Sequence, residues 1–444
     1  MTSLGAIAAS VGRRTSAIRG KLTRYRYVVS AADQLAISLL NFGLTFVLLR
    51  LLSAPEFGTV AVWMAASNLA IVVQGALVTT PLSIYAPAES DEAKRHQLEE
   101  TLGSLNLLVI ILAVITVVVV NLVTDAEWVP KDVLAWAAIP LYVGSDMSRQ
   151  YYRISAFGRQ DMMMLLIVDA PYLAVTSVCI LVMLIWPSLA GLGGAFVSLM
   201  LGAFVGQFCG ALRLAGRRIR LWRSGWIRPY RAIFGEVMWS LIGVVSTHLQ
   251  ERSYVYITTS LVGLAEVASL NAVAVLFRPA QILLTAWRRS ALPEFARLFA
   301  EGRVAVVYRR IALASTVALS ACLIWCAVLW VGWRIIEQHL FAGKYPEASL
   351  LLLPWAIAIS LDAIEFIVST ALQAVREFRY LAWVTMLTAP ITVVAIAGLT
   401  MWHGYTWTLY GLTIGNGLSA ALVVSRLFRI RHRVGQSAAT DSAH

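Results

Sequence analysis

Long apolar stretches alternate with short polar connections along most of this chain of 444 residues. The first two stretches, residues 28–52 and 59–87, flank a polar connection in which Pro55 and Gly58 favour a tight turn. Each stretch is long enough to cross about 30 Å of hydrocarbon as a helix. Because a segment in lipid must satisfy its own backbone hydrogen bonds, the pattern predicts α-helices.

The same alternation continues to residue 428 and predicts twelve membrane-spanning helices. The ten that follow the first pair cover residues 102–123, 133–155, 162–186, 190–212, 233–261, 265–287, 308–333, 348–375, 379–401 and 405–428. The fold class predicted from this pattern is an all-α membrane protein.

The first turn has a counterpart 210 residues later. The segment LSAPEFG at residues 52–58 aligns with VGLAEVA at residues 262–268, and Thr80-Pro81 aligns with Leu292-Pro293 at an offset of 212. Two anchors at nearly one offset indicate an internal duplication, a plan that is common in transporters with a site between the halves. The predicted parts are a tail (1–27), a lobe of six helices (28–212), a basic linker (213–232), a second lobe of six helices (233–428) and a tail (429–444).

Composition and charge support a membrane protein and indicate its orientation. Hydrophobic residues make up 59% of the chain and charged residues only 14%, against about 25% in soluble proteins. The predicted inner segments hold 30 of the 36 Lys and Arg residues and the outer connections hold three. This asymmetry predicts that both tails and the linker are cytoplasmic, and it explains the net charge of +12 without a nucleic-acid partner. The four cysteines lie inside predicted helices and indicate neither a disulfide nor a metal site.

Short motifs in both halves point to a family. They are Ala32-Asp33-Gln34, Asn41-Phe42, Leu49-Arg50 and Glu56-Phe57-Gly58 in the first half, and Phe277-Arg278-Pro279 and LPEFARL at residues 292–298 in the second. In these motifs the chain resembles the Wzx-type polysaccharide and O-antigen flippases of the multidrug/oligosaccharidyl-lipid/polysaccharide exporter superfamily. The resemblance implies a MATE-like exporter fold, with two six-helix lobes that rock around a central cavity.

The resemblance also implies a function. A flippase of this kind moves undecaprenyl-diphosphate-linked oligosaccharide units from the inner to the outer leaflet of the bacterial inner membrane, for surface polysaccharide or exopolysaccharide synthesis. It is not an enzyme and needs no cofactor. Its expected partners are the lipid-linked oligosaccharide, membrane lipids, a polysaccharide polymerase and a chain-length regulator.

Two other classes of function remain open. A cation-coupled multidrug or metabolite antiporter of the related multidrug-extrusion branch would share the fold, but a cavity for cationic drugs would be dominated by carboxylates and aromatic rings. A membrane enzyme such as a polymerase or ligase usually carries a long outer loop, whereas the longest outer connection here is residues 334–347.

Five polar residues inside predicted helices are candidate substrate ligands. An ionisable residue within a span costs about 2.5–3.5 kcal/mol on insertion scales, so each requires a reason. Guanidinium groups form forked, charge-assisted hydrogen bonds with phosphate, which suits an anionic head group. The candidates are Arg252, Arg278, His248, Asn41 and Gln281. The alternative roles are an ion pair of Arg252 with Glu251, a position of Arg278 at the lipid interface, and ordinary interhelical packing.

Three carboxylates are candidates for ion coupling. Asp362 and Glu365 lie one turn apart, so they repel when both are charged and one should hold a proton. Asp33 stands at the inner end of the first helix, where a helix cap or a pair with a tail arginine is an alternative role. Asp146 and Arg149, also one turn apart, are interpreted as a structural pair, and Asp169 receives no role.

Overall fold

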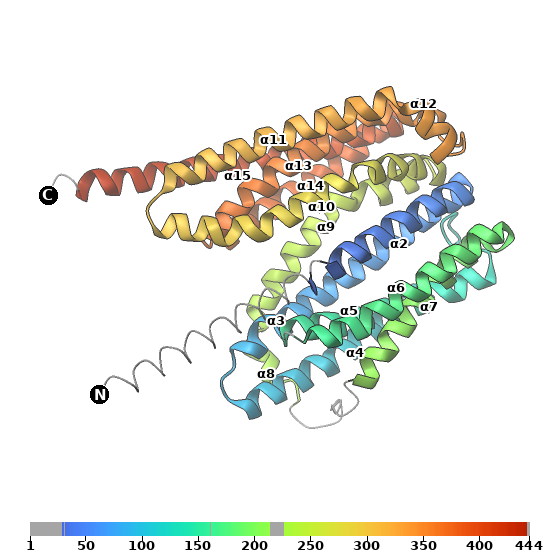
Figure 1. The fold of residues 1–444 in the computed structure, drawn as a ribbon, viewed down its shortest axis with the longest axis horizontal. Coiled ribbons are helices and arrows are strands. Elements are labelled where there is room, and N and C mark those ends of the chain that lie inside the picture. Colours follow the sequence, from blue (N-terminus) through green and yellow to red (C-terminus); the bar gives the residue numbers. More distant parts are fainter. Residues whose placement is uncertain (1–28, 31, 160, 214–225, 442–444) are drawn as a thin grey trace, which may run out of the picture.

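The computed structural model describes residues 29–30, 32–159, 161–213 and 226–441, and helices form nearly all of this part of the chain (Figure 1). No strand occurs among these residues, so the prediction of an all-α fold is confirmed. The tail predicted for residues 1–27 and most of the predicted linker lie outside the described residues.

The N-terminal lobe begins with a helix at Ala32–Leu51. The elements that follow are α2 (Ala54–Gln74), the π-helical segment η1 (Gly75–Thr79), α3 (Thr80–Ala88), α4 (Glu92–Val123), α5 (Val133–Gly158), α6 (Met162–Ile185), η2 (Pro187–Leu189) and α7 (Leu192–Arg213). Within this lobe α7 packs against both α5 and α6.

The C-terminal lobe follows the short helix α8 (Arg228–Arg231). Its elements are α9 (Phe234–Leu261), α10 (Leu264–Ala300), α11 (Val304–Val331), α12 (Trp333–Ile335), η3 (Ile336–Leu340), η4 (Pro346–Leu351), α13 (Leu352–Ala374), α14 (Phe378–His403), η5 (Tyr405–Trp407) and α15 (Thr408–Asp441). Helix α15 therefore continues beyond residue 428, where the sequence predicts that the last span ends.

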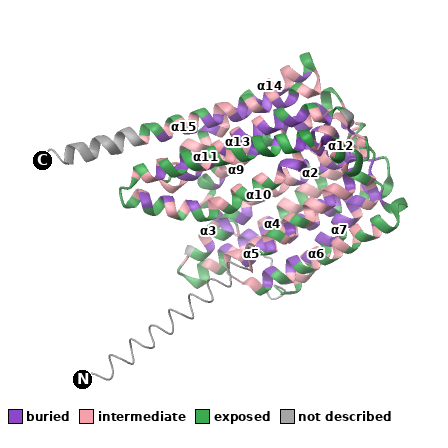
Figure 2. Ribbon diagram, turned by 45° about the horizontal axis from the view of Figure 1, so that its top comes forward, coloured by how far each residue is buried: buried purple, intermediate pink, exposed green. Residues whose placement is uncertain are grey.

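Ten helices of the described chain are long and apolar enough to cross a membrane. Two further helices, α5 and α9, have 26 and 28 residues but carry several charged side chains. Together they make the twelve predicted long helices of a multi-pass membrane protein. Exposed residues run along α11 (Figure 2), and several are large and apolar, as expected of a lipid-facing surface.

The starts of α2 and α10 reproduce the sequence repeat, because Ala54 and Leu264 are 210 residues apart. Ser53 and Glu56 form a capping box at the start of α2, in which the Glu56 carboxylate accepts from the Ser53 amide at 2.9 Å. Helix α10 continues through Pro279 without a break. The Trp325 indole donates to the Leu276 carbonyl at 2.9 Å, which stabilises the backbone next to the turn that the proline weakens.

The two lobes share a core at one end of the molecule and separate at the other. At the closed end, one hydrophobic cluster joins helices of both lobes, and it includes Phe57, Trp63, Val267 and Leu270. At the open end, one cluster forms around Phe295 in the C-terminal lobe, and another joins α3 and α4 to Tyr230 of α8 and Val237 at the start of α9. Figure 1 shows the lobes diverging toward the side on which α3 and α8 lie.

Candidate functional site

A cavity of about 290 Å³ lies between the two lobes. The first helix, α2, α5, α6 and α7 line it from the N-terminal lobe, and α9 and α10 line it from the other. Its charged and polar lining residues are Asn41, Thr45, Ser67, Asn68, Asp146, Arg149, Gln150, Tyr172, Arg252, Asn271 and Arg278. Three of these are arginines and one is a carboxylate, so cations outnumber anions on the cavity wall.

Arg252 and Arg278 come from neighbouring helices and face this cavity together. The Arg278 guanidinium donates to the Thr45 hydroxyl at 3.2 Å, a bond that joins the two lobes. Thr45 can accept it because its own proton goes to the Asn41 carbonyl at 2.6 Å. Neither arginine forms an ion pair within 4 Å among the residues that the structure describes, and most of their donors are therefore available to a ligand.

The remaining predicted substrate ligands divide into one inside and two outside the cavity. Asn41 lines it and accepts a hydrogen bond from the Tyr172 hydroxyl at 3.2 Å. His248 is buried one turn away from Arg252, with a ring nitrogen 3.2 Å from the Tyr256 hydroxyl, and it does not line the cavity. Gln281 is exposed one turn beyond Arg278. Helical spacing places such residues on one face, but the cavity spans only part of that face.

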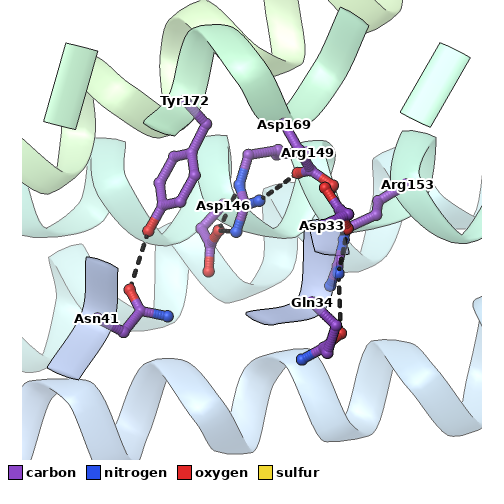
Figure 3. Close-up of polar contacts among 8 residues, drawn as sticks. All are labelled: Asp33, Gln34, Asn41, Asp146, Arg149, Arg153, Asp169 and Tyr172. Carbon is purple, nitrogen blue, oxygen red and sulfur yellow. Dashed lines mark hydrogen bonds and ion pairs between the residues drawn. The ribbon is translucent and has the colours of Figure 1, made fainter. Parts of the chain in front are cut away.

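Five buried ionisable residues form a continuous network in the N-terminal lobe (Figure 3). Arg149 pairs with Asp146 at 2.7 Å and with Asp169 at 2.9 Å, and Arg153 pairs with Asp169 at 2.8 Å and with Asp33 at 3.0 Å. All five side chains are buried, so breaking a pair would leave an uncompensated charge in a medium of low dielectric constant. The network ties the first helix, α5 and α6 into one unit.

This network bears on several interpretations of the sequence. Asp33 pairs with Arg153 of α5, a partner that the sequence did not indicate; the tail arginines lie outside the described residues. Arg149 and Arg153, counted with the inner connections, are buried in α5 instead. The predicted pair of Asp146 and Arg149 is confirmed. The spacing of Asp146, Arg149 and Arg153 on one face of an apolar helix is the signal that could have revealed the network.

The two carboxylates on α13 lie apart from the arginine cavity. Asp362 and Glu365 are half-buried and do not line that cavity. Glu251 of α9 is close enough to interact electrostatically with both of them. Among the described residues, no basic side chain lies within 4 Å of either carboxylate. Asp362 and Glu365 are therefore two neighbouring acidic groups without an ion-pair partner among the described residues, whereas Glu251 also interacts with the adjacent Arg252.

A lysine closes the end of the molecule where the lobes share a core. The Lys344 amine, in the loop between η3 and η4, donates to the carbonyls of Arg50 and Leu52 at 2.7 and 2.6 Å. These carbonyls end the first helix of the other lobe, where the helix dipole favours a cation. Burial lowers the pKa of Lys344. The Arg50 side chain is exposed at the same helix end and does not line the cavity.

Solved structures with the same arrangement are transporters and a lipid flippase. An inward-facing multidrug resistance MATE family transporter of the MOP superfamily superposes with a TM-score of 0.71 and 13% identity, over 90% of this chain and 94% of that one. The lipid II flippase MurJ, in an inward closed conformation, superposes with a TM-score of 0.67 and 10% identity, over 91% and 87% of the two chains. The chain therefore shares the fold of these two proteins.

A second MATE family structure superposes less well. An outward-facing structure of a MATE family transporter reaches a TM-score of only 0.52 at 13% identity, over 93% of each chain. The higher score of the inward-facing structure agrees with lobes that separate at one end only. No protein-family model and no curated protein sequence matches this chain.

Proposed function

We propose that this protein is a flippase for undecaprenyl-diphosphate-linked oligosaccharides in the bacterial inner membrane, where it serves surface polysaccharide or exopolysaccharide synthesis. The observation that carries the proposal is the pair of arginines, Arg252 and Arg278, facing one inter-lobe cavity without a carboxylate partner in the described chain. Guanidinium groups can form forked bonds with the oxygens of a diphosphate. Thr45 and Asn41 complete the polar wall opposite them.

The lobe arrangement supports a transport cycle of alternating access. The cavity opens between the lobes, and the interlobe bond from Arg278 to Thr45 would have to break or re-form as they move. Two arginines bind a polyanion without enclosing it, which allows release after the lobes have moved. The comparison with MurJ, described as a lipid II flippase, makes a lipid-linked substrate reasonable for this fold.

The test replaces each arginine. We expect Arg252→Ala and Arg278→Ala to stop surface polysaccharide from appearing while the protein remains at normal levels in the membrane. Arg→Lys at either site should restore only part of the export, since lysine keeps the charge and loses the fork. Arg289→Ala is the matched control, because Arg289 is an exposed arginine of the same helix α10.

The competing function is a cation-coupled multidrug or metabolite antiporter; two structures with the same fold are described as multidrug resistance MATE family transporters. Full export of polysaccharide by the Arg252→Ala, Arg278→Ala double variant would contradict the flippase proposal. Increased drug sensitivity of cells lacking the protein, with normal surface polysaccharide, would favour the antiporter.

A further inference from the structure

A second, apolar groove lies on the opposite side of α2 from the arginine cavity. Its volume is about 480 Å³, and it runs between α2 and α4 with the end of α9 along one rim. One wall extends from Val62 in α2 to Leu77 in η1, and the other extends from Val109 to Val120 in α4. Small side chains, Ala70 and Ala113 among them, leave the space open.

The polar donors that line the groove are already engaged in hydrogen bonds within the protein. The hydroxyls of Thr116, Thr259 and Ser260 donate to carbonyls of their own helices at 2.8, 2.7 and 2.9 Å. The Tyr256 hydroxyl is 3.2 Å from a ring nitrogen of His248, and the Trp63 indole donates to the Trp128 carbonyl at 3.0 Å. With these donors engaged and the rest of the lining apolar, the groove favours a hydrocarbon chain over water, which needs two or more polar partners.

The length of the groove indicates which kind of hydrocarbon chain would fill it. Val62 and Leu77 are separated by 15 residues, or about 22 Å at 1.5 Å per residue. A chain confined to one leaflet covers roughly 15 Å, half of the hydrocarbon core. We infer that the groove binds a long isoprenoid chain, the tail of the carrier lipid, rather than an ordinary acyl chain. This inference rests on the proposed function and extends it to the other end of the same substrate.

The arginine cavity, as the site of the diphosphate head, and the apolar groove, as the site of the tail, are positioned to bind the two ends of one molecule. Alternate faces of α2 line them, with Ala61 and Met64 on the cavity side and Val62 and Trp63 on the groove side. On α9, Arg252 lines the cavity and Tyr256, one turn farther along, lines the groove. The apolar groove would therefore bind the lipid tail with an affinity that depends on chain length, while the arginine cavity recognises the charge of the head group.

Binding of two diphosphates that differ only in chain length tests the inference. The probes are tritiated farnesyl diphosphate and tritiated undecaprenyl diphosphate, measured on the purified protein in detergent. We expect wild type to bind the long chain more tightly, and Ala70→Phe or Ala113→Phe to weaken long-chain binding roughly tenfold or more, since a filled groove no longer buries several methylene groups. Binding of the short chain should stay unchanged. Ala321→Phe, at an exposed position on α11, is the control.

The outcomes separate the groove from the head site. If Arg252→Ala binds neither diphosphate while wild type binds both, the result supports the arginine cavity as the head site and says nothing of the groove. If both groove variants still prefer the long chain, the assignment of the groove to the lipid tail is wrong. If wild type binds neither diphosphate, the proposed function fails instead.

A second measurement needs no variant. A diazirine-bearing undecaprenyl diphosphate should label residues 62–77 and 109–120 of wild type. Equal labelling of these segments by a diazirine-bearing phosphatidylglycerol would overturn the assignment to an isoprenoid chain.

Discussion

Gly58 of α2 lies directly against the carbonyl of Leu264 at the start of α10, so closely that a Cβ at residue 58 would overlap the Leu264 oxygen. In the repeat at an offset of 210, Gly58 corresponds to Ala268 and Leu264 corresponds to Ala54, so the two residues lie one helical turn apart in the repeated pattern. The contact brings the starts of two equivalent helices together at the closed end of the molecule.

Replacing Gly58 by alanine should open the closed end. The added methyl group meets backbone rather than a flexible side chain, so the two helices must move apart. We expect a longer distance between spin labels at positions 133 and 350, measured by double electron–electron resonance in a protein without native cysteines. Gly398→Ala is the control, because nothing lies within 4 Å of a Cβ at that residue. An unchanged distance in Gly58→Ala would contradict the expectation.

Lys344→Met should also favour opening at this end. The change keeps most of the apolar stem and removes both hydrogen bonds to the Arg50 and Leu52 carbonyls. Each hydrogen bond from a charged donor stabilises by about 1.5–3 kcal/mol. The same pair of spin labels should report a new, longer component, whereas Lys131→Met, at an exposed lysine, should not produce it.

The buried network should contribute to stability rather than to ion coupling. Arg153→Met leaves Asp33 without its partner, and breaking a buried pair destabilises by about 3–5 kcal/mol. We expect a clearly lower melting temperature in detergent and partial recovery in the Asp33→Asn, Arg153→Met double variant. Arg95→Met removes an exposed pair with Glu92 and should change stability by about 0–1 kcal/mol. A melting temperature of Arg153→Met equal to that of Arg95→Met would exclude a structural role.

Asp362 and Glu365 are our candidates for coupling to a proton or another cation. Replacing them by Asn and Gln removes both charges at nearly constant volume. If a proton binds there, transport by the double variant should no longer depend on a pH gradient, while the amount of folded protein stays the same. Asp132→Asn, at an exposed helix cap in the other lobe, serves as the control. Unchanged dependence on the gradient would reduce the pair to a structural role.

The orientation in the membrane is a separate prediction. The asymmetry of Lys and Arg predicts that both ends of the chain and the linker are cytoplasmic. Reporter fusions after Gly225 and after Val434 should therefore both score as cytoplasmic. A periplasmic score at either position would contradict twelve spans with this orientation.

The apolar pattern predicted where the helices are, but not where all of them end. The helix predicted for 265–287 extends to Ala300, because its last turns carry charged residues that continue beyond the hydrocarbon and were assigned to a connection. The repeat at residues 52–58 and 262–268 located the matching helix starts, since capping and turn residues are local signals.

The polar interior was predicted less well. Arg252 and Arg278 were recognisable because a charge in an apolar stretch stands out. The partners of Asp33 could not be identified, since Arg153 is 120 residues away and only the packing of three helices brings the two together. The contact of Lys344 at the closed end could not be predicted either, because its acceptors are backbone carbonyls, which every residue carries.

The buried network also has a consequence for the synthesis of the protein. Helix α5 carries Arg149 and Arg153 and is not among the helices apolar enough to enter a membrane by composition alone. The ion-pair partners of α5 lie in the helices synthesised before and after it. Asp33 is in the first helix, which leaves the ribosome earlier, and Asp169 is in α6, which leaves later. Insertion of α5 is thus expected to wait for α6, so that both helices enter the bilayer as a hairpin beside the first helix.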